Sequence, residues 1–383
     1  MAATHIRGRS VLAIALVGAL TAACGGAPTE AGGTTGAQPT PASAATSSGR
    51  AASAKWTRSP EIKLEDTSFG RAQRIGDELW VSATTKGASV VHVFDLGSHA
   101  LKKTITVAAR ALAAADNVNA IASSAHAVFL DTGAGNLQGV DRATGAVSAY
   151  RQLPSTDAEV KPGKPVSEPD GEFAYALVGD TLFELDTADA VPLRNWPLTD
   201  PSGPEVPAGA TLDHRVLGAA AGLIWYGVVA KTTPLTAPPE YDHLLAFDPA
   251  KDSVRPIDVK ADGVIAGPAT VGDKAVFAHQ GKLWLVDPSK GAATPLEFTR
   301  LFADGRAKPT ASIDSLSTYG TEAAVVVDGL AEVVDTATGT SSIVPEECDK
   351  PKPAYNACLF GSAVLAKDAL WFVTPSAITV FTR

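Results

Sequence analysis

The stretch from residue 281 to 298 reads GKLWLVDPSKGAATPLEF. Two short runs rich in β-branched, aromatic and other apolar residues flank an Asp-Pro-Ser-Lys-Gly segment, a pattern typical of two β-strands joined by a tight turn. Similar stretches recur at 136–153 (NLQGVDRATGAVSAYRQL) and at 330–345 (LAEVVDTATGTSSIVP). The chain therefore repeats one hairpin, and the number and spacing of its copies decide the fold.

Six copies of the hairpin carry an apolar residue followed by the turn Asp. These are Asp95, Asp141, Asp186, Asp248, Asp287 and Asp335. Their spacing averages about 48 residues, with one long interval before Asp248, and such a period belongs to repeat architectures. In turns such as DRATG and DPSKG the Asp side chain caps the turn backbone and the Gly supplies a positive φ. We therefore interpret the turn Asp residues as structural rather than catalytic.

Each unit resolves into four short β-rich runs separated by Gly-containing turns, which is the pattern of a β-propeller blade. A seventh unit, CLFGSAVLAK, ALWFVTP and AITVFTR, supplies only three strands before Arg383. We expect the segment EIKLED at 61–66 to provide the missing outer strand, because such a closure removes an exposed sheet edge. The sequence thus predicts an all-β, seven-bladed β-propeller in which an N-terminal strand closes the last blade.

The repeated unit, a strand followed by D-x-x-T-G and a second strand, resembles that of the quinoprotein-like (PQQ/YVTN-type) propellers over about residues 60–383. This resemblance implies the propeller fold. Pyrroloquinoline-quinone enzymes of that group carry a Trp-rich repeat, whereas this chain has six Trp in total. We therefore expect no cofactor, and we assign Trp80, Trp225, Trp284 and Trp371, which fall in predicted strands, to the packing between blades.

The N-terminus has the layout of an export signal over residues 1–23, with Arg7 and Arg9 before an apolar run. LTAAC resembles a bacterial lipobox, in which Cys24 becomes lipid-modified; the alternative is a plain secretory signal. Residues 24–58 are rich in Gly, Ala, Ser, Thr and Pro, which is typical of a flexible tether. The sequence predicts a propeller at 59–383, exported and anchored to the outer face of the cell membrane by lipid on Cys24.

The formal net charge is −9, and most of the acidic excess falls beyond the tether. An acidic domain repels nucleic acid, so we expect no nucleic-acid partner. In an exported protein, Cys348 and Cys358 are expected to form a disulfide, worth roughly 2 to 3 kcal/mol if unstrained. The alternative, a metal site, lacks further Cys or His ligands nearby.

Long Pro-containing segments are expected to gather on one face of the propeller, opposite the tight Asp turns. They are 155–171, 199–213, 231–242, 299–314 and 346–358. Loops of this length are often binding elements. The residues predicted at the channel mouth on that face are Asn119, His214, Arg215, Tyr241, Asp242, His243 and Asp314. The pairs Asp213-His214 and Asp242-His243 suit metal or acid–base chemistry, but packing explains the few His better, and we assign no metal ligands.

These observations favour a surface-tethered, non-enzymatic binding or scaffolding propeller of the cell envelope. We expect it to be a monomer that holds a protein, peptide or envelope component on the face of the long Pro-containing segments and contacts the membrane through its N-terminal lipid. One alternative is an enzyme, of lyase or hydrolase type, using His214, Asp314 or His243 at the channel mouth. Another is a metal- or solute-delivery protein working beside a transporter. No G-x-S-x-G, H-E-x-x-H, C-x-x-C or phosphate-binding loop is present.

Overall fold

Each repeat of the sequence folds into one four-stranded antiparallel sheet. The computed structural model describes residues 56–107, 118, 120–132, 136–149, 151–154, 163–199, 212–230, 243–257, 265–279, 281–297, 313–327, 329–344 and 362–383. The chain divides into the units Met1–Gly49 and Arg50–Arg383, and every described residue belongs to the second. None of these residues forms a helix long and apolar enough to cross a membrane.

The strands of each blade follow one another from the channel outward. Blade one holds β2 (Thr67–Ile75), β3 (Glu78–Thr85), β4 (Ala88–Asp95) and β5 (Leu101–Thr106). Blade two holds β6 (Ala120–Ser123), β7 (Ala127–Asp131), β8 (Asn136–Asp141) and β9 (Arg151–Gln152). Blade three holds β10 (Val166–Ser167), β11 (Ala174–Val178), β12 (Thr181–Leu185) and β13 (Pro192–Pro197). Blade four holds β14 (Leu212–Ala220), β15 (Leu223–Ala230), β16 (His243–Asp248) and β17 (Ser253–Ile257).

The remaining three blades repeat the same order. Blade five holds β18 (Ala266–Val271), β19 (Lys274–His279), β20 (Lys282–Asp287) and β21 (Ala292–Glu297). Blade six holds β22 (Ile313–Tyr319), β23 (Glu322–Val327), β24 (Leu330–Asp335) and β25 (Ser341–Val344). Blade seven holds β26 (Ser362–Ala366), β27 (Ala369–Val373) and β28 (Ile378–Thr382), with β1 (Thr57–Arg58) as its outer strand.

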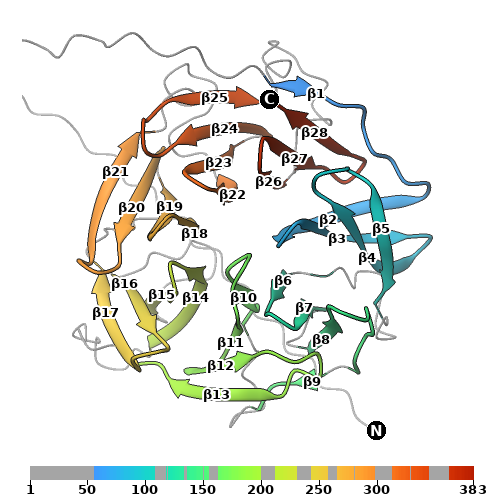
Figure 1. Cartoon of the computed structure of the whole chain (residues 1–383). Coiled ribbons are helices and arrows are strands. Elements are labelled where there is room, and N and C mark those ends of the chain that lie inside the picture. The colour runs from blue at the N-terminus through green and yellow to red at the C-terminus, as the bar shows by residue number, and fades with distance from the viewer. Residues whose placement is uncertain are drawn as a thin grey trace, which may run out of the picture. The chain divides into compact units, whose positions relative to one another are not determined.

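The seven inner strands stand side by side around one axis (Figure 1). Each of β2, β6, β10, β14, β18, β22 and β26 contacts the inner strands of both neighbouring blades, so the ring is closed. The prediction of an all-β, seven-bladed propeller is thereby confirmed.

The N-terminal closure is confirmed, but the pairing segment differs from the one expected at 61–66. Thr57 pairs with Thr382 and Arg58 with Phe381, whereas Ile62 forms only an isolated bridge to Ile378. Pro60 has no N–H to donate, so it interrupts the ladder between these two points. The closing strand thus begins within the stretch assigned to the tether. The apolar alternation at 61–66 reflects core packing, because Ile62 and Leu64 pack between blades seven and one.

The hydrophobic core consists of layers between adjacent blades. Trp80, Trp225 and Trp371 have no exposed surface, and each belongs to a cluster that joins two blades. Trp225 packs edge-on against Phe277 of blade five, with ring centroids 5.0 Å apart. The predicted inter-blade packing is therefore confirmed for these three tryptophans, while Trp284 is only partly buried against the layer between blades four and five.

Antiparallel connection gives the propeller two unlike faces. We call the side that carries the turns between first and second and between third and fourth strands the tight-turn face, and the other side the long-loop face. The stretch 155–171, read from the sequence as one long link, is divided by β10, the two-residue inner strand of blade three. Pro165 and Pro169 flank this strand and hide its sequence signal. Residues 168–173 therefore belong to the tight-turn face.

Candidate functional site

Five of the six turn Asp residues cap their own turns. Asp141 accepts hydrogen bonds from the Thr144 backbone N–H and hydroxyl, both at 2.7 Å, and Asp287 accepts the same pair from Ser289 at 2.9 and 2.6 Å. The Ser289 hydroxyl and the Lys290 ammonium lower the pKa of Asp287 to about 2. Asp95 accepts the N–H and the hydroxyl of Ser98, and Asp248 and Asp335 accept backbone N–H groups of their own turns. These carboxylates are structural, as interpreted from the sequence.

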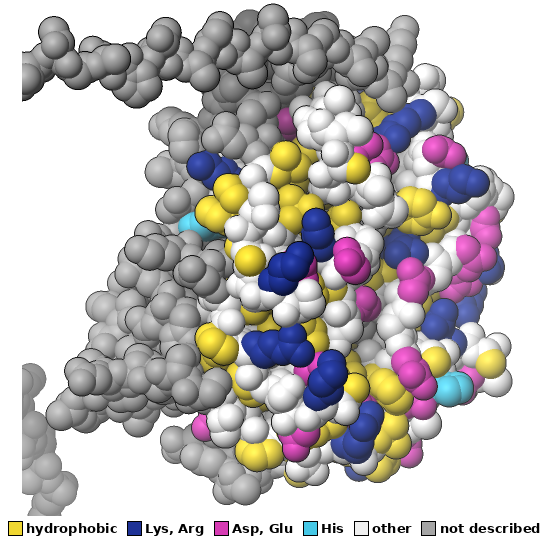
Figure 2. Space-filling view, turned by 60° about the vertical axis from the view of Figure 1, so that its left-hand side comes forward, with side chains coloured by type: hydrophobic (Ala, Val, Ile, Leu, Met, Phe, Trp, Pro, Cys, Tyr) yellow, Lys and Arg dark blue, Asp and Glu magenta, His cyan; other side chains and the backbone are white. Residues whose placement is uncertain are grey.

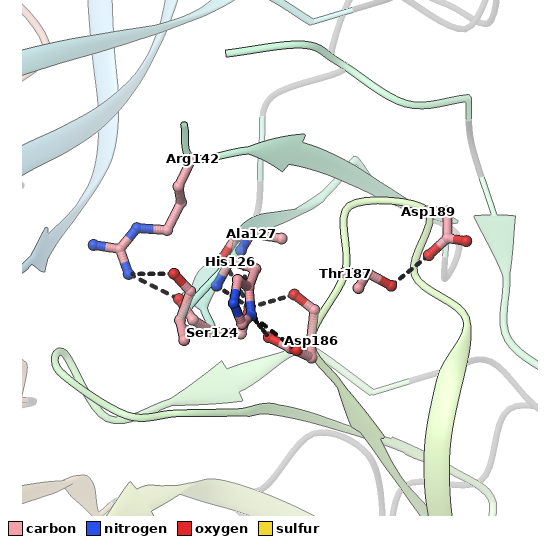
Figure 3. Close-up of polar contacts among 8 residues, drawn as sticks. Ser124, His126, Ala127, Arg142, Asp186, Thr187 and Asp189 are labelled. Atoms are coloured by element: carbon pink, nitrogen blue, oxygen red, sulfur yellow. Dashed lines mark hydrogen bonds and ion pairs between the residues drawn. The ribbon is translucent and has the colours of Figure 1, made fainter. Parts of the chain in front are cut away.

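The turn Asp of blade three departs from this rule, as Figure 3 shows. Asp186 accepts a hydrogen bond from Nδ1 of His126 in blade two, at 2.8 Å. Its turn is capped instead by Asp189, which accepts from the Thr187 hydroxyl at 2.6 Å and from the Val191 N–H at 3.3 Å. Asp186 therefore joins two blades on the tight-turn face.

Ser124 lies beside this pair, so blade two and blade three bring Ser, His and Asp together (Figure 3). The Ser124 hydroxyl donates to the Asp186 carbonyl at 2.5 Å and accepts the N–H groups of His126 and Ala127 at 3.2 and 2.9 Å. Ser124 has no exposed surface, whereas 71% of the His126 side chain is exposed. A nucleophile must reach its substrate and hand its proton to the imidazole, so this cluster fastens the blades and is not a catalytic triad.

Two of the predicted mouth residues, His214 and Arg215, are neighbours on β14. His214 Nδ1 donates to Asp180 of blade three at 2.7 Å, and its ring lies 5.8 Å from that of Tyr226. Only 9% of the His214 side chain is exposed. Because side chains alternate along a strand, Arg215 points to the opposite face of the sheet. The structure thus places His214 between two blades, as a packed and bonded imidazole.

The other predicted site residues are only partly covered by the structure. Asp314 is exposed, at a β-bulge in which Ile313 pairs with Val327 and Ser315 with Val326. His243 begins β16 opposite Val228, but its side chain lies outside the described residues. The same holds for the whole of Asn119, Tyr241, Asp242, Cys24, Cys348 and Cys358. Their predicted roles stay predictions.

The channel between the inner strands forms a cavity of about 240 Å³, lined by residues of all seven blades. Hydroxyl groups link neighbouring inner strands there: Ser167 accepts the Ser123 N–H at 2.8 Å, and Ser317 accepts the Leu365 N–H at 2.9 Å. A sheet edge has unpaired backbone groups, and these hydroxyls satisfy some of them. The channel wall is thus part of the scaffold.

Arg74 occupies the tight-turn end of this channel, a role that no sequence motif marked. Its guanidinium pairs with both carboxylate oxygens of Asp170 in blade three, at 2.7 and 3.3 Å. The same group lies 5.4 Å from the ring centre of Tyr319 in blade six. One side chain from blade one therefore spans the channel end and holds three blades.

No group of three or more His, Cys, Asp and Glu side chains is arranged to hold a metal ion, as far as the chain is described.

Comparison with known proteins identifies the architecture. No family model matches the chain, and no curated protein does either. Among solved structures 1116 chains match. One is the β-propeller domain of Cps50 (Swd1) from Myceliophteria thermophila, with a TM-score of 0.56 and 11% sequence identity, covering 86% of this chain and 100% of that one. At this identity the similarity shows the fold alone, and the quinoprotein-like resemblance stays a prediction.

Proposed function

We propose that this protein is a non-enzymatic propeller that binds a protein or peptide partner while tethered to the outer face of the cell membrane. The observation that carries the proposal is the position of its exposed apolar side chains. Within the described residues, every exposed large hydrophobic residue lies on blades one to three: Leu101, Val147, Val191 and Leu193. All four directly follow the tight turn between the third and fourth strands of their blades.

We call these three turns the turn rim and define it as residues 95–101, 141–147 and 186–193. Arg151 of blade two donates to the Asp189 carbonyl of blade three at 2.6 Å. Single exposed apolar residues are ordinary, but a patch ringed by polar groups is typical of an interaction surface. Three consecutive blades present such residues at the same place, which favours a docking edge.

The side of the propeller formed by blades four and five differs from the turn rim in its surface composition. Figure 2 shows the side that carries β17 and β21, where Lys and Arg side chains intermingle with Asp and Glu. Ion pairs account for part of this pattern, such as Lys251 with Asp248 at 2.6 Å and Lys290 with Asp287 at 3.0 Å. Such a surface favours solubility rather than docking, so it supplies a matched control for the turn rim.

The described imidazoles are engaged in the scaffold, which supports a binding role over catalysis. His92 is buried and bonded to the Thr104 hydroxyl at 2.9 Å, and burial lowers its pKa. His126 and His214 are each bonded to an Asp of blade three. The enzyme and solute-delivery alternatives, like the hypothesis that the partner binds the long-loop face, depend largely on segments outside the described residues.

Membrane tethering is proposed from the lipobox-like LTAAC and the Gly-, Ala- and Ser-rich stretch that follows Cys24. A Cys24→Ala variant tests this part of the proposal by itself. Fractionation of the producing cells should move the protein from the membrane fraction to the soluble exported fraction, and palmitate labelling should disappear. An unchanged distribution of the variant would contradict lipid anchoring.

Photo-crosslinking tests the docking edge. A benzoylphenylalanine is placed at Leu193 on the turn rim, and in a second variant at Thr294, an exposed position on the outer strand of blade five. Irradiation of producing cells should yield one dominant crosslinked polypeptide from position 193 and none from position 294. The same products from both positions would contradict docking at the turn rim.

A further inference from the structure

A groove opens on the tight-turn face between blades three and four. Its volume is about 260 Å³, with Glu168, Glu172, Phe173 and Tyr175 of blade three on one side and Ala219 and Ile224 of blade four on the other. Pockets for drug-sized ligands measure roughly 300 to 1,000 Å³. The groove therefore suits a single amino-acid side chain better than a larger cofactor.

The carboxylate of Glu168 is held in place at the rim of the groove. One oxygen accepts the Gly222 N–H at 2.6 Å and the other accepts the Thr270 hydroxyl at 3.0 Å. The Gly171 N–H donates to the Glu168 carbonyl at 3.1 Å, which fixes the turn that follows. Each carboxylate oxygen has a second lone pair, so Glu168 can accept further hydrogen bonds without reorganising.

Glu172 supplies a second carboxylate at the same opening. Its side chain is exposed, and its carbonyl accepts the Ala125 N–H at 2.9 Å, which fastens its backbone to blade two. Throughout the described residues, neither Glu172 nor Glu168 forms a salt bridge, while the nearby Asp170 is already paired with Arg74. Within the part of the chain that the structure describes, the groove thus carries negative charge that no side chain neutralises through a salt bridge.

Aromatic rings form the wall between these carboxylates and the inter-blade core. Phe173 is half-buried, and Tyr175 is 8% exposed. Burial is the main cause that raises the pKa of Tyr175, and the charge of Glu184 adds to it. The phenol therefore stays neutral at physiological pH, and its ring offers an apolar face. Aromatic faces beside carboxylates attract planar cations.

The protein's own Arg194 shows the same chemistry on the neighbouring surface of blade three. Its guanidinium donates to both oxygens of the buried Glu184 at 2.9 and 2.7 Å. It also lies 5.8 Å from the ring centre of Phe173 and 5.2 Å from that of Trp196. Arg194 pairs bidentately with Glu184 and forms no salt bridge with Glu168 or Glu172, although Glu172 attracts it at longer range.

We propose that the groove between blades three and four binds an arginine side chain of the partner polypeptide, with Glu168 and Glu172 accepting from its guanidinium and Phe173 and Tyr175 flanking it. Arginine fits better than lysine because its planar fork pairs with carboxylates and stacks on rings at once. This inference rests on the proposed function and names the chemistry of its partner.

Nuclear magnetic resonance titration of the purified protein tests the groove without the natural partner. The probe is a capped five-residue peptide of Gly and Ser with one central arginine, and its matched control has citrulline, which keeps the shape and loses the charge. The arginine peptide should shift the amide signals of Gly171 and Gly222 in a saturable way, at least about fivefold more strongly than the citrulline peptide. Equal shifts from both peptides, or larger shifts from a lysine peptide, would overturn the assignment.

Variants locate the binding and leave the fold intact. Glu172→Gln removes an exposed charge and should weaken arginine binding about three- to fivefold. Asp368→Asn, an exposed carboxylate on the corresponding hairpin of blade seven, should leave it unchanged. Equal effects of the two variants would show only a response to net charge and would contradict the assignment of arginine binding to the groove. If the arginine peptide does not bind in the groove while crosslinking at Leu193 succeeds, only this inference is wrong. If crosslinking at Leu193 also fails, the proposed function is wrong as well.

Discussion

Asp186 accepts a hydrogen bond from His126 at 2.8 Å across the boundary between blades two and three, although its five counterparts cap their own turns. The Ser124 hydroxyl completes the connection by donating to the Asp186 carbonyl at 2.5 Å. A turn position has thus been converted into an inter-blade fastening at one place in the ring, directly beside the turn rim.

The two partners of Asp186 should differ in their effect on stability. Ser124→Ala removes a buried hydroxyl that makes three short contacts to backbone groups and should cost about 2 kcal/mol. His126→Gln removes an exposed partner and should cost less than about 1 kcal/mol. Urea denaturation measures both. A larger loss from His126→Gln than from Ser124→Ala would contradict the assignment of the fastening to the hydroxyl.

The turn cap formed by Asp287 should make the stability of the protein depend on pH. Its pKa is lowered from 3.8 to about 2 in the folded protein by the Ser289 hydroxyl and by Lys290. A lowered pKa means that the carboxylate stabilises the fold above about pH 4 and that this contribution is lost as the pH falls through about 2. The melting temperatures of wild type and Asp287→Ala should therefore differ at pH 7 and converge near pH 2. A difference that does not change between these pH values would contradict the cap.

Close packing of blades two and three depends on a glycine. A Cβ added at Gly139 would lie 1.9 Å from the carbonyl oxygen of Ala188 in blade three. Gly139→Ala should therefore force the blades apart and cost about 3 kcal/mol. Gly97→Ala is the control, since its nearest contact would be an ordinary 3.6 Å. Thermal melts of the two variants should separate clearly, and equal melting temperatures would contradict the inter-blade contact.

Closure of the ring by β1 predicts a sharp boundary in a truncation series. Trp56 donates to the Ser342 hydroxyl at 2.9 Å, and Arg383 lies over its ring at 4.4 Å. A chain beginning at residue 56 should melt like the full protein, whereas one beginning at residue 61 should lose about 2 kcal/mol and melt several degrees lower. Identical melting of the two truncated chains would show that Ile62 alone suffices for closure.

The hairpin repeat was enough to predict the blades, because an apolar strand, an Asp cap and a positive-φ Gly are all local features. Gly145, Gly291 and Gly339 do adopt positive φ in their turns. Two details could not be predicted from the sequence, for physical reasons. Pro60 divides the closing segment, and the two-residue inner strand of blade three lies between prolines, so neither shows the alternation that marks a strand.

The candidate sites were harder to predict, because they depend on contacts between distant residues. Asp186 follows an apolar residue at the end of a strand, as the other turn Asp residues do, yet its partner His126 lies 60 residues away. Glu168 belongs to the stretch 155–171, which was read as a link on the long-loop face, and only the position of β10 assigns it to the opposite side. His214 was singled out for its residue type, which says nothing of its contact with Asp180.

The most direct test of the central claim is hydrogen–deuterium exchange of the protein with and without the partner captured from position 193. The account predicts that the partner slows exchange in the turn rim at 95–101, 141–147 and 186–193 and in the groove at 168–173, and leaves blades five and six unchanged. Slower exchange confined to the segments 199–213, 231–242 and 299–314, which the sequence predicts to be binding elements of the long-loop face, would contradict it.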